Sequence, residues 1–267
     1  MTEKDMIYFW QLHNDLKNLP KDLRNLDVSE IKNKYLNSIE LKKLINKIFK
    51  REISDKKIKK NIYNIIDALK KNEICDKFYL INISRFSIVF KNNTKVLKIG
   101  FPKVTYKIPS CSIILNSIIR KQYQNIIFVE IQDYKKNNLE SMYSKEEIDN
   151  IIYSIWKEFR KNNIIWFDPK SKNIVIDDNN TNVVKWNENY YSIPSNEEKG
   201  VYNTDFDIVY QNFKIVDTDL FLPISVIDDL KKSKEENPDA PGFTNWKYRT
   251  LLDYENRYNK EVNNEKL

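Results

Sequence analysis

The chain has 267 residues, of which 41% are apolar and 13% aromatic, which predicts a packed core in one large or two small domains. Its net charge of +7 is spread in short runs, which favours a solvated basic surface over a nucleic-acid partner. A single histidine, His13, and two cysteines without metal-ligand spacing exclude most zinc sites. The sequence lacks a signal-peptide pattern, and no apolar run approaches the roughly 20 residues that a membrane span needs.

Three helices are expected first along the chain. Their apolar residues recur at helical spacing and their outer faces are charged. His13 falls on the apolar stripe of the first helix, where we expect a packed side chain. The three helices are predicted at residues 3–18, 28–49 and 55–71.

Short runs of β-favouring residues follow the helices. Asn92 and Asn93 separate the second run from the third and indicate a turn. The three runs predict an antiparallel meander at residues 78–83, 86–90 and 95–99. A helix at 112–121 and one more strand at 126–132 are expected next.

The second half opens with Ser144 and Glu147, which have the spacing of a helix capping box. The amphipathic helix behind them is expected to end at Asn162 and Asn163. The order of segments predicts an α+β fold without internal repeats. The later segments are strands at 164–167, 174–176 and 213–216, a polar insertion or long hairpin at 177–206, a loop at 238–242 and a helix at 244–260.

The candidate functional residues lie at the ends of apolar runs. Asp168, Lys170 and Asn173 share one loop, and Asp217 ends a later strand with Asp219 two residues on. Phosphoryl transfer from a metal-bound nucleotide needs an Asp at the acceptor, a cation for the transferred group and hard oxygen ligands for Mg²⁺. The pattern therefore predicts such chemistry, and an ordinary helix-to-strand turn is the alternative for the first loop.

In this order of motifs the chain resembles the protein-kinase-like superfamily over roughly residues 75–225. The resemblance implies a two-lobed kinase-like fold with a reduced C-lobe and an extra helical N-terminal region. The implied divisions are 1–73 for the helical region, 74–134 for the N-lobe and 135–267 for the C-lobe.

The resemblance also implies roles for single residues. Asp168 would be the catalytic aspartate, Lys170 would neutralise the γ-phosphate, and Asn173, Asp217 and Asp219 would hold Mg²⁺ or Mn²⁺. Lys98 would contact the phosphates of ATP, with a solvated edge-strand lysine as the alternative. The backbone at residues 130–134 would contact adenine, which makes Glu130 and Gln132 candidate nucleotide-binding residues.

The chain departs from the family pattern in several respects. The glycine-rich loop is missing, and we expect either backbone amides of that turn or the side chains of Ser84, Arg85 and Ser87 to bind phosphate instead. No acidic residue lies between Lys98 and Glu130, so the usual Glu partner of the lysine must come from the N-terminal helices or be absent. Only fifty residues follow Asp217, too few for the substrate-binding part of a full kinase C-lobe. The N-terminal helices are expected to replace the packing of that part or to cover the site.

These motifs predict an atypical kinase that transfers the γ-phosphoryl group of Mg-ATP to a hydroxyl, with protein Ser or Thr as the first acceptor class. A small-molecule hydroxyl acceptor is also open. The alternatives are a pseudokinase that serves as a binding scaffold and a transferase of AMP or glutamate on the same fold. We expect a cytoplasmic protein, or one in a host cytosol if it is a secreted effector.

Overall fold

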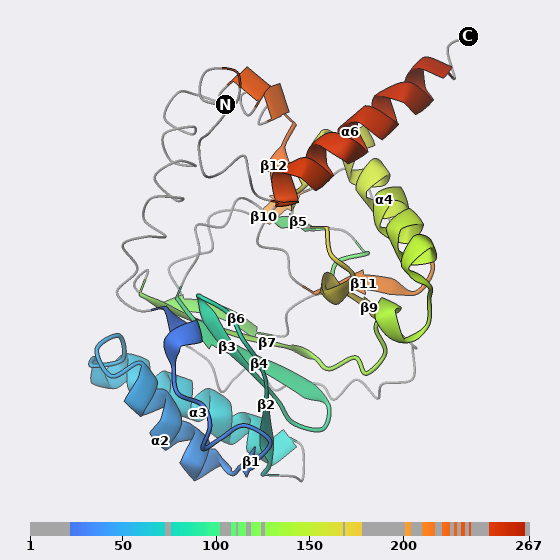
Figure 1. Ribbon diagram of the computed structural model, residues 1–267. Helices are drawn as coiled ribbons and strands as arrows, with labels where there is room; N and C mark the ends of the chain where they lie inside the picture. The colour runs from blue at the N-terminus through green and yellow to red at the C-terminus, as the bar shows by residue number, and fades with distance from the viewer. Residues whose placement is uncertain are drawn as a thin grey trace.

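The largest element of the protein is an antiparallel sheet of six strands in the order β1-β2-β3-β4-β7-β6, in a mixed α+β structure (Figure 1). The predicted α+β class is confirmed. The computed structural model describes residues 22–72, 76–101, 108–110, 112–115, 119–123, 126–167, 169–177, 201–203, 210–216, 221–224, 227–228, 231–232, 235 and 246–264.

The predicted meander forms the middle of this sheet. Asn92 closes the turn between its second and third strands, because its N–H donates to the Lys95 carbonyl at 3.0 Å and its Oδ1 accepts from the Lys95 N–H at 2.9 Å. The sheet strands are β1 (Tyr35–Leu36), β2 (Phe78–Ile83), β3 (Ser87–Lys91), β4 (Lys95–Gly100), β6 (Ile119–Tyr123) and β7 (Ile127–Asp133).

Two of the predicted helices are wrong in part. The helix expected at 28–49 begins only at Ser38, because Asn37 caps it by accepting from the backbone of its first turn, and the residues before it form β1. The helix expected at 112–121 is replaced at Ile119–Tyr123 by strand β6, which pairs with β7. Pairing with a distant strand outweighs the local helical pattern there.

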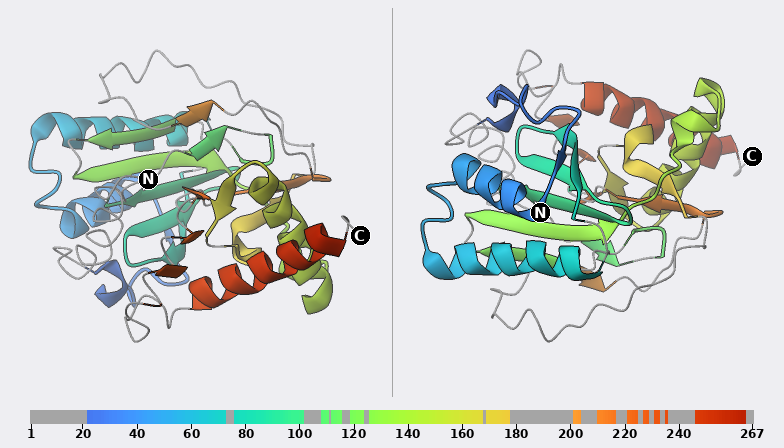
Figure 2. Two further views of the ribbon diagram at one scale, coloured as in Figure 1. Left: turned by 90° about the horizontal axis from the view of Figure 1, so that it is seen from above. Right: turned by 90° about the horizontal axis from the view of Figure 1, so that it is seen from below.

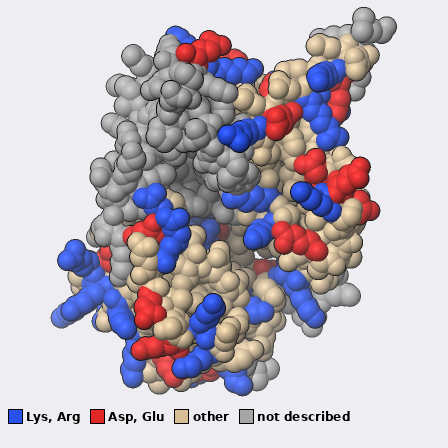
Figure 3. All heavy atoms as spheres, viewed as in Figure 1, with Lys and Arg blue, Asp and Glu red and all other residues tan. Residues whose placement is uncertain are grey.

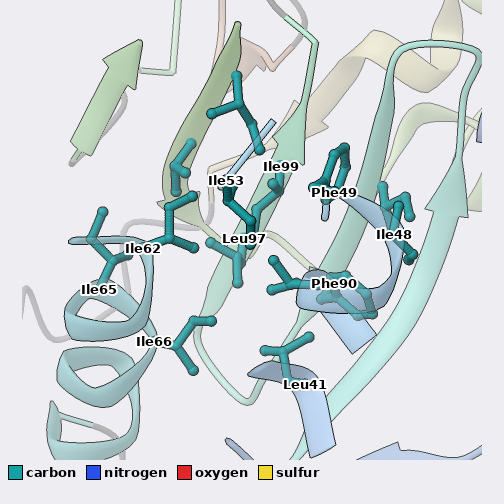
Figure 4. Packing of buried hydrophobic residues seen from close by; sticks show 14 of the residues in the cluster. Leu41, Ile48, Phe49, Ile53, Ile62, Ile65, Ile66, Phe90, Leu97 and Ile99 are labelled. Atoms are coloured by element: carbon teal, nitrogen blue, oxygen red, sulfur yellow. The ribbon is translucent and has the colours of Figure 1, made fainter. Parts of the chain in front are cut away.

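Helices α2 (Ser38–Ile48) and α3 (Lys56–Asn72) pack as a hairpin on one face of the sheet, as the right panel of Figure 2, seen from below, shows. Their apolar stripes and the inward side chains of the sheet form a single core (Figure 4). The helices and the sheet therefore share one core, while the predicted divisions at residues 73 and 134 stay predictions. Core residues from both layers include Leu41, Ile45, Phe49, Ile53, Ile62, Ile66, Phe90, Leu97, Ile99 and Val129.

The opposite face of the sheet carries polar side chains. Successive residues of a strand point to opposite faces, so Lys98 and Glu130 lie on the face turned away from α2 and α3. The two residues are register partners on neighbouring strands, and Arg120 of β6 is the partner of Glu130 on its other side. The N-terminal hairpin therefore does not cover this face, in contrast to one of the expectations from the sequence.

A second core lies in the later half of the chain around α4 (Lys145–Lys161). Its capping box is confirmed, because the Ser144 N–H donates to Glu147 Oε2 at 2.8 Å and the Ser144 Oγ accepts from the Glu147 N–H at 3.4 Å. The helix ends at Asn162, and Asn163 follows it with a φ of 60°. The strands of this half are β8 (Ile164–Trp166), β9 (Ile174–Ile176), β11 (Phe213–Ile215) and β12 (Phe221–Pro223).

The last helix, α6 (Trp246–Asn264), packs against α4, as Figure 1 shows. A buried ion pair joins the two helices: the Arg160 guanidinium donates two hydrogen bonds of 2.8 Å to the Glu255 carboxylate. Aromatic side chains pack beside it, with the Tyr254 ring 5.6 Å from that of Trp156. The C-terminal helix predicted at 244–260 is thereby confirmed.

Five shorter segments are also described. Strand β5 (Ile108–Ser110) pairs in parallel with β10 (Val201–Asn203), and the 3-10 turns are η1 (Leu23–Asn25), η2 (Leu139–Ser141) and η3 (Ser171–Asn173). The helix predicted at 3–18, most of the insertion at 177–206 and the loop at 238–242 lie outside the described residues. Within the part of the chain that is described, none of the helices combines the length and apolarity needed to cross a membrane.

Candidate functional site

Two antiparallel pairings bring the ends of the candidate loops together. Strand β9 pairs with β11, so that Ile174 lies opposite Ile215, and β8 pairs with β12. One residue beyond the β9–β11 pairing, the Val216 N–H donates to the Asn173 carbonyl at 2.9 Å. The residue that precedes Asp217 is therefore hydrogen-bonded to the residue that ends the Asp168 loop.

Asn173 and Lys170 bracket the short turn η3. The Asn173 N–H donates to the Lys170 carbonyl at 2.9 Å, and the Asn173 side chain is buried. Burial between two strand ends restrains the rotamer of this amide, as a ligand position requires. Asp168, Asp217 and Asp219 lie outside the described residues, so their catalytic and metal-binding roles stay predictions.

Lys98 lies in the middle of the sheet, because β4 is paired with β3 on one side and with β7 on the other. Its side chain is 14% exposed, which rules out the alternative of a solvated lysine on an edge strand. The Nζ atom lies 3.9 Å from Glu130 Oε2 and 5.7 Å from the centre of the Phe128 ring. Lys98 is therefore held on a rigid strand in a largely buried environment.

The partner of Lys98 differs from the expectation. The described N-terminal helices, α2 and α3, supply no carboxylate to it, because they pack on the other face of the sheet, and the helix expected at 3–18 lies outside the described residues. Among the described residues, Glu130 from the adjacent strand is its carboxylate partner, with a side chain only 5% exposed. Arg120 joins the same carboxylate, with its Nη1 atom 3.9 Å from Glu130 Oε1. Arg120 was not predicted, and only the sheet register reveals it.

This register also places the Glu130 backbone inside the sheet. Residue 130 lies between Lys98 on β4 and Arg120 on β6. In an antiparallel sheet the N–H and C=O groups of an inner strand bond to its neighbours. The Glu130 backbone is therefore used within the sheet and its side chain faces Lys98, while the predicted adenine contact of residues 130–134 stays a prediction.

Gln132 connects the sheet to the second half of the protein. Its Nε2 lies 3.3 Å from the Leu115 carbonyl and 3.3 Å from the Val216 carbonyl, and donates to both. The side chain is buried, so these bonds satisfy an amide that would be costly to leave without partners. Gln132 thus ties the Lys98 face of the sheet to the strand end before Asp217, and its predicted contact with nucleotide stays a prediction.

The β2–β3 turn, which replaces a glycine-rich loop, is closed by its own side chains. The Ser84 Oγ accepts from the N–H groups of Phe86 and Ser87 at 3.3 and 3.0 Å and lies 2.9 Å from the Ser87 Oγ. The Ser84 N–H donates to the Ser87 carbonyl at 2.8 Å. Ser84 and Ser87 therefore have a structural role in the turn, and their binding of phosphate stays a prediction.

Arg85 is directed to the chain that precedes the sheet. Its Nε lies 3.6 Å from Asp22 Oδ2, and its carbonyl accepts from the Leu23 N–H at 3.1 Å. The side-chain hydrogen bond from Arg24, with Arg85 nearby, holds the pKa of the Asp22 carboxyl below its usual value. The turn is thus fastened to the start of the described chain, which differs from a guanidinium reaching for phosphate.

The side-chain oxygens expected where Val216 meets the Asn173 loop are suited to Mg²⁺, which prefers hard oxygen ligands. Asn173 offers an amide oxygen, and Asp217 and Asp219 bring carboxylates in the sequence directly after Val216. Among the described residues alone, His, Cys, Asp and Glu side chains form no cluster of three or more that would hold a metal. A divalent cation at this place would therefore need carboxylates from outside the described residues, and Asp217 and Asp219 are the predicted ones.

A further ion pair, Lys135 with Asp177, was not predicted from the sequence. Lys135 follows the sheet and Asp177 follows β9, and their Nζ and Oδ1 atoms are 2.5 Å apart with the lysine side chain 6% exposed. The pair fixes the connection between the sheet and the second half.

No family model matches the chain, and none of the curated proteins matches it.

Proposed function

We propose that the protein is an atypical, protein-kinase-like phosphotransferase that uses Mg-ATP. The proposal includes a two-lobed arrangement, with the sheet as the N-lobe and the α4–α6 half as a reduced C-lobe. It is supported by a central-strand lysine, Lys98, on the sheet face that Gln132 ties to the strand end before Asp217. The first acceptor class is a Ser or Thr hydroxyl of a protein.

The observation that carries the proposal is the hydrogen bond from the Val216 N–H to the Asn173 carbonyl. Two short β pairings hold this junction, so the residues that follow Val216 begin beside the loop that ends at Asn173. Phosphoryl transfer depends on positioning and charge neutralisation, and a rigid junction of this kind supplies the positioning. A pair of unrelated surface turns would not require this register.

Each residue then has a role in the proposal. Asp168 orients the acceptor hydroxyl or takes its proton, and Lys170 neutralises charge on the transferred group. Asn173 and Asp217 hold Mg²⁺, which when bound would neutralise charge on the phosphates. Lys98 contacts phosphate oxygens, and Glu130 is its positioning residue from the neighbouring strand.

A second candidate is a binding scaffold without turnover, and the β2–β3 turn favours it. Ser84 and Ser87 use their hydroxyl groups within the turn, and Arg85 is directed to Asp22. A turn closed in this way leaves the phosphates without the backbone cradle that a glycine-rich loop supplies. The scaffold proposal expects weak or absent binding of Mg-ATP.

The test combines nucleotide binding with turnover in the full chain. We expect Mg-ATP to raise the melting temperature of the wild type, and Asp168→Ala and Asp217→Ala to lose ATP turnover. Asp253→Ala, an exposed aspartate on α6, is the matched control and is expected to keep turnover. Wild-type turnover in both site variants would overturn the proposal.

The same experiment separates the rivals. No thermal shift with Mg-ATP and no turnover in the wild type would select the scaffold. Mass spectrometry of a modified acceptor distinguishes phosphate from AMP or glutamate by the added mass. An added AMP or glutamate would show that the protein is a different transferase and not a kinase.

A further inference from the structure

The charged residues occur in short runs along the whole chain, but the net charge is concentrated in the α2–α3 hairpin, which reopens the nucleic-acid partner that the sequence disfavoured. Residues 37–72 contain eleven Lys or Arg and four Asp or Glu, a net charge of +7 that equals the charge of the whole chain. The other 231 residues contain 34 of each kind, because 45 less 11 and 38 less 4 both leave 34. A general enrichment in lysine would have left an excess elsewhere, so this concentration is a property of the hairpin.

The exposed cations gather around the bend of the hairpin. Figure 3 shows Lys and Arg side chains at the lower left of the molecule, over the connection between α2 and α3. The ion pairs of Lys42 with Asp67 and Lys70 with Asp76 lie away from this bend. We call the exposed residues around the bend the basic hairpin surface, which consists of Lys43, Lys47, Lys50, Arg51, Lys56, Lys57 and Lys60.

The bend is a rigid support for these cations. Phe49 and Ile53 are each 1% exposed, and the Phe49 ring meets the Phe101 ring edge-on at 5.7 Å. Ile58 in the next turn is also buried in the core beneath the sheet. The cations therefore project from a backbone that is anchored on both sides of the bend.

Two lysines of this surface stand where the helix itself disfavours them. Lys56 and Lys57 are the first residues of α3, and the first turn of that helix contains no acidic residue. The amino end of a helix carries partial positive charge, so cations there are unfavourable by a few tenths of a kcal/mol. Asp55 partly relieves this by accepting from the Lys57 N–H at 2.6 Å. The stability of α3 therefore does not account for the lysines at its start, and a function at the surface does.

We propose that the basic hairpin surface binds the phosphodiester backbone of nucleic acid without reading its sequence. Lysine-rich surfaces bind regularly spaced phosphates through charge and counterion release. The surface lies on the sheet face opposite Lys98, so the binding is separate from the proposed phosphotransfer. It goes beyond the proposed function and does not depend on it.

Two other anionic partners fit the surface less well. Peripheral membrane helices insert an apolar face, whereas the apolar faces of α2 and α3 are buried against the sheet. Protein interfaces have an apolar centre, but the large apolar side chain that the hairpin exposes, Ile39, lies in the first turn of α2, away from the bend. Nucleic-acid interfaces are polar and strongly positive, which matches this surface.

The test measures fluorescence anisotropy of labelled nucleic acid with the full chain over a range of salt concentrations. The probes are a mixed-sequence DNA duplex and a single-stranded RNA, each of about 20 nucleotides per strand, so that contacts with several phosphates are possible. The test variant carries Lys56→Glu, Lys57→Glu and Lys60→Glu. The matched control carries Lys231→Glu, Lys232→Glu and Lys260→Glu, three exposed lysines outside the hairpin with the same change in net charge.

We expect the hairpin variant to bind at least about tenfold more weakly and its logarithmic salt slope on duplex DNA to fall by about 3. The control is expected to lose less than about threefold, since only the general field of the protein changes. Glutamates at the start of α3 suit the helix end, so the variant is expected to fold, and a second variant with Gln at the same positions checks the result.

Three outcomes would overturn the proposal. The first is an equal loss of affinity in the hairpin variant and in the control. The second is an absence of binding to both probes at low salt. The third is tighter binding of the wild type to poly-glutamate or to phosphatidylserine vesicles than to nucleic acid.

Discussion

The ion pair between Arg160 on α4 and Glu255 on α6 makes a quantitative prediction about how the C-terminal helix is held. Both hydrogen bonds measure 2.8 Å, and the exposed fractions of the two side chains are 16% and 5%. The carboxylate raises the pKa of the Arg160 guanidinium through its hydrogen bonds. The guanidinium also lies 4.9 Å from the centre of the Tyr258 ring.

Replacing Glu255 by Gln removes the charge and leaves Arg160 largely buried. Breaking a buried pair by removing one partner costs about 3 to 5 kcal/mol, because the remaining charge is not compensated. We expect the lower end, about 3 kcal/mol, since the guanidinium keeps some contact with water and with the Tyr258 ring. For a chain of this size that corresponds to a fall in melting temperature of roughly 6 to 12 °C.

Urea unfolding followed by tryptophan fluorescence measures the effect, because Trp156 and Trp166 are fully buried in the same core as α6. The matched control is Glu158→Gln, which breaks the exposed pair with Lys161 on the same helix. Exposed pairs of this kind are worth about 0.3 to 0.5 kcal/mol.

The two results must differ for the reasoning to hold. If Glu255→Gln costs no more than Glu158→Gln, the Arg160 pair is not desolvated and does not hold α6 in place. A combined change to Arg160→Met and Glu255→Leu is expected to recover most of the loss, because an apolar pair leaves no buried charge.

Two further changes test the sheet and its connection to the helical hairpin. Gly100→Ala would place a Cβ 2.0 Å from the Phe86 carbonyl oxygen, so we expect a loss of about 3 kcal/mol in urea unfolding, and a loss below about 1 kcal/mol would contradict this contact. Burial acts to raise the pKa of Asp76, but hydrogen bonds from Ser38 and Lys70 outweigh it and lower the pKa below 3.8. The stability from this carboxylate is therefore present above the unfolded-state pKa and is lost as the pH falls through the folded-state pKa. Asp76→Asn should flatten the fall in stability below about pH 4, and an unchanged acid unfolding profile would refute the assignment.

Much of the fold follows from local patterns in the sequence. The capping box at Ser144, the apolar period of residues 55–71 and the Asn92–Asn93 turn predicted their elements correctly, because each is a short-range preference of the backbone. The predicted helix at 112–121 failed because pairing of Ile119–Tyr123 with β7 is a long-range contact. Local propensity cannot report such a contact.

The candidate site likewise combines residues that the sequence indicated with contacts that it could not indicate. The sequence indicated Lys98, Asn173 and the aspartate after residue 216, from their order and their apolar flanks. It did not indicate that Glu130 would be the partner of Lys98, or that Gln132 would join the sheet to Val216. These contacts depend on strand register and on the packing of one half of the chain against the other, since a one-residue slip would turn each side chain to the other face.

The sequence by itself therefore determined the elements with strong local signals, such as α3, the capped helix α4 and the Asn92 turn, and the residue types able to bind phosphate and metal, because these depend on neighbours within a few positions. Only the tertiary structure decided which face of the sheet carries Lys98, which carboxylate meets it and which face the basic hairpin occupies. The physical reason is that pairing and burial join residues far apart in the chain, and the gain in apolar burial selects one arrangement among many that the local patterns allow.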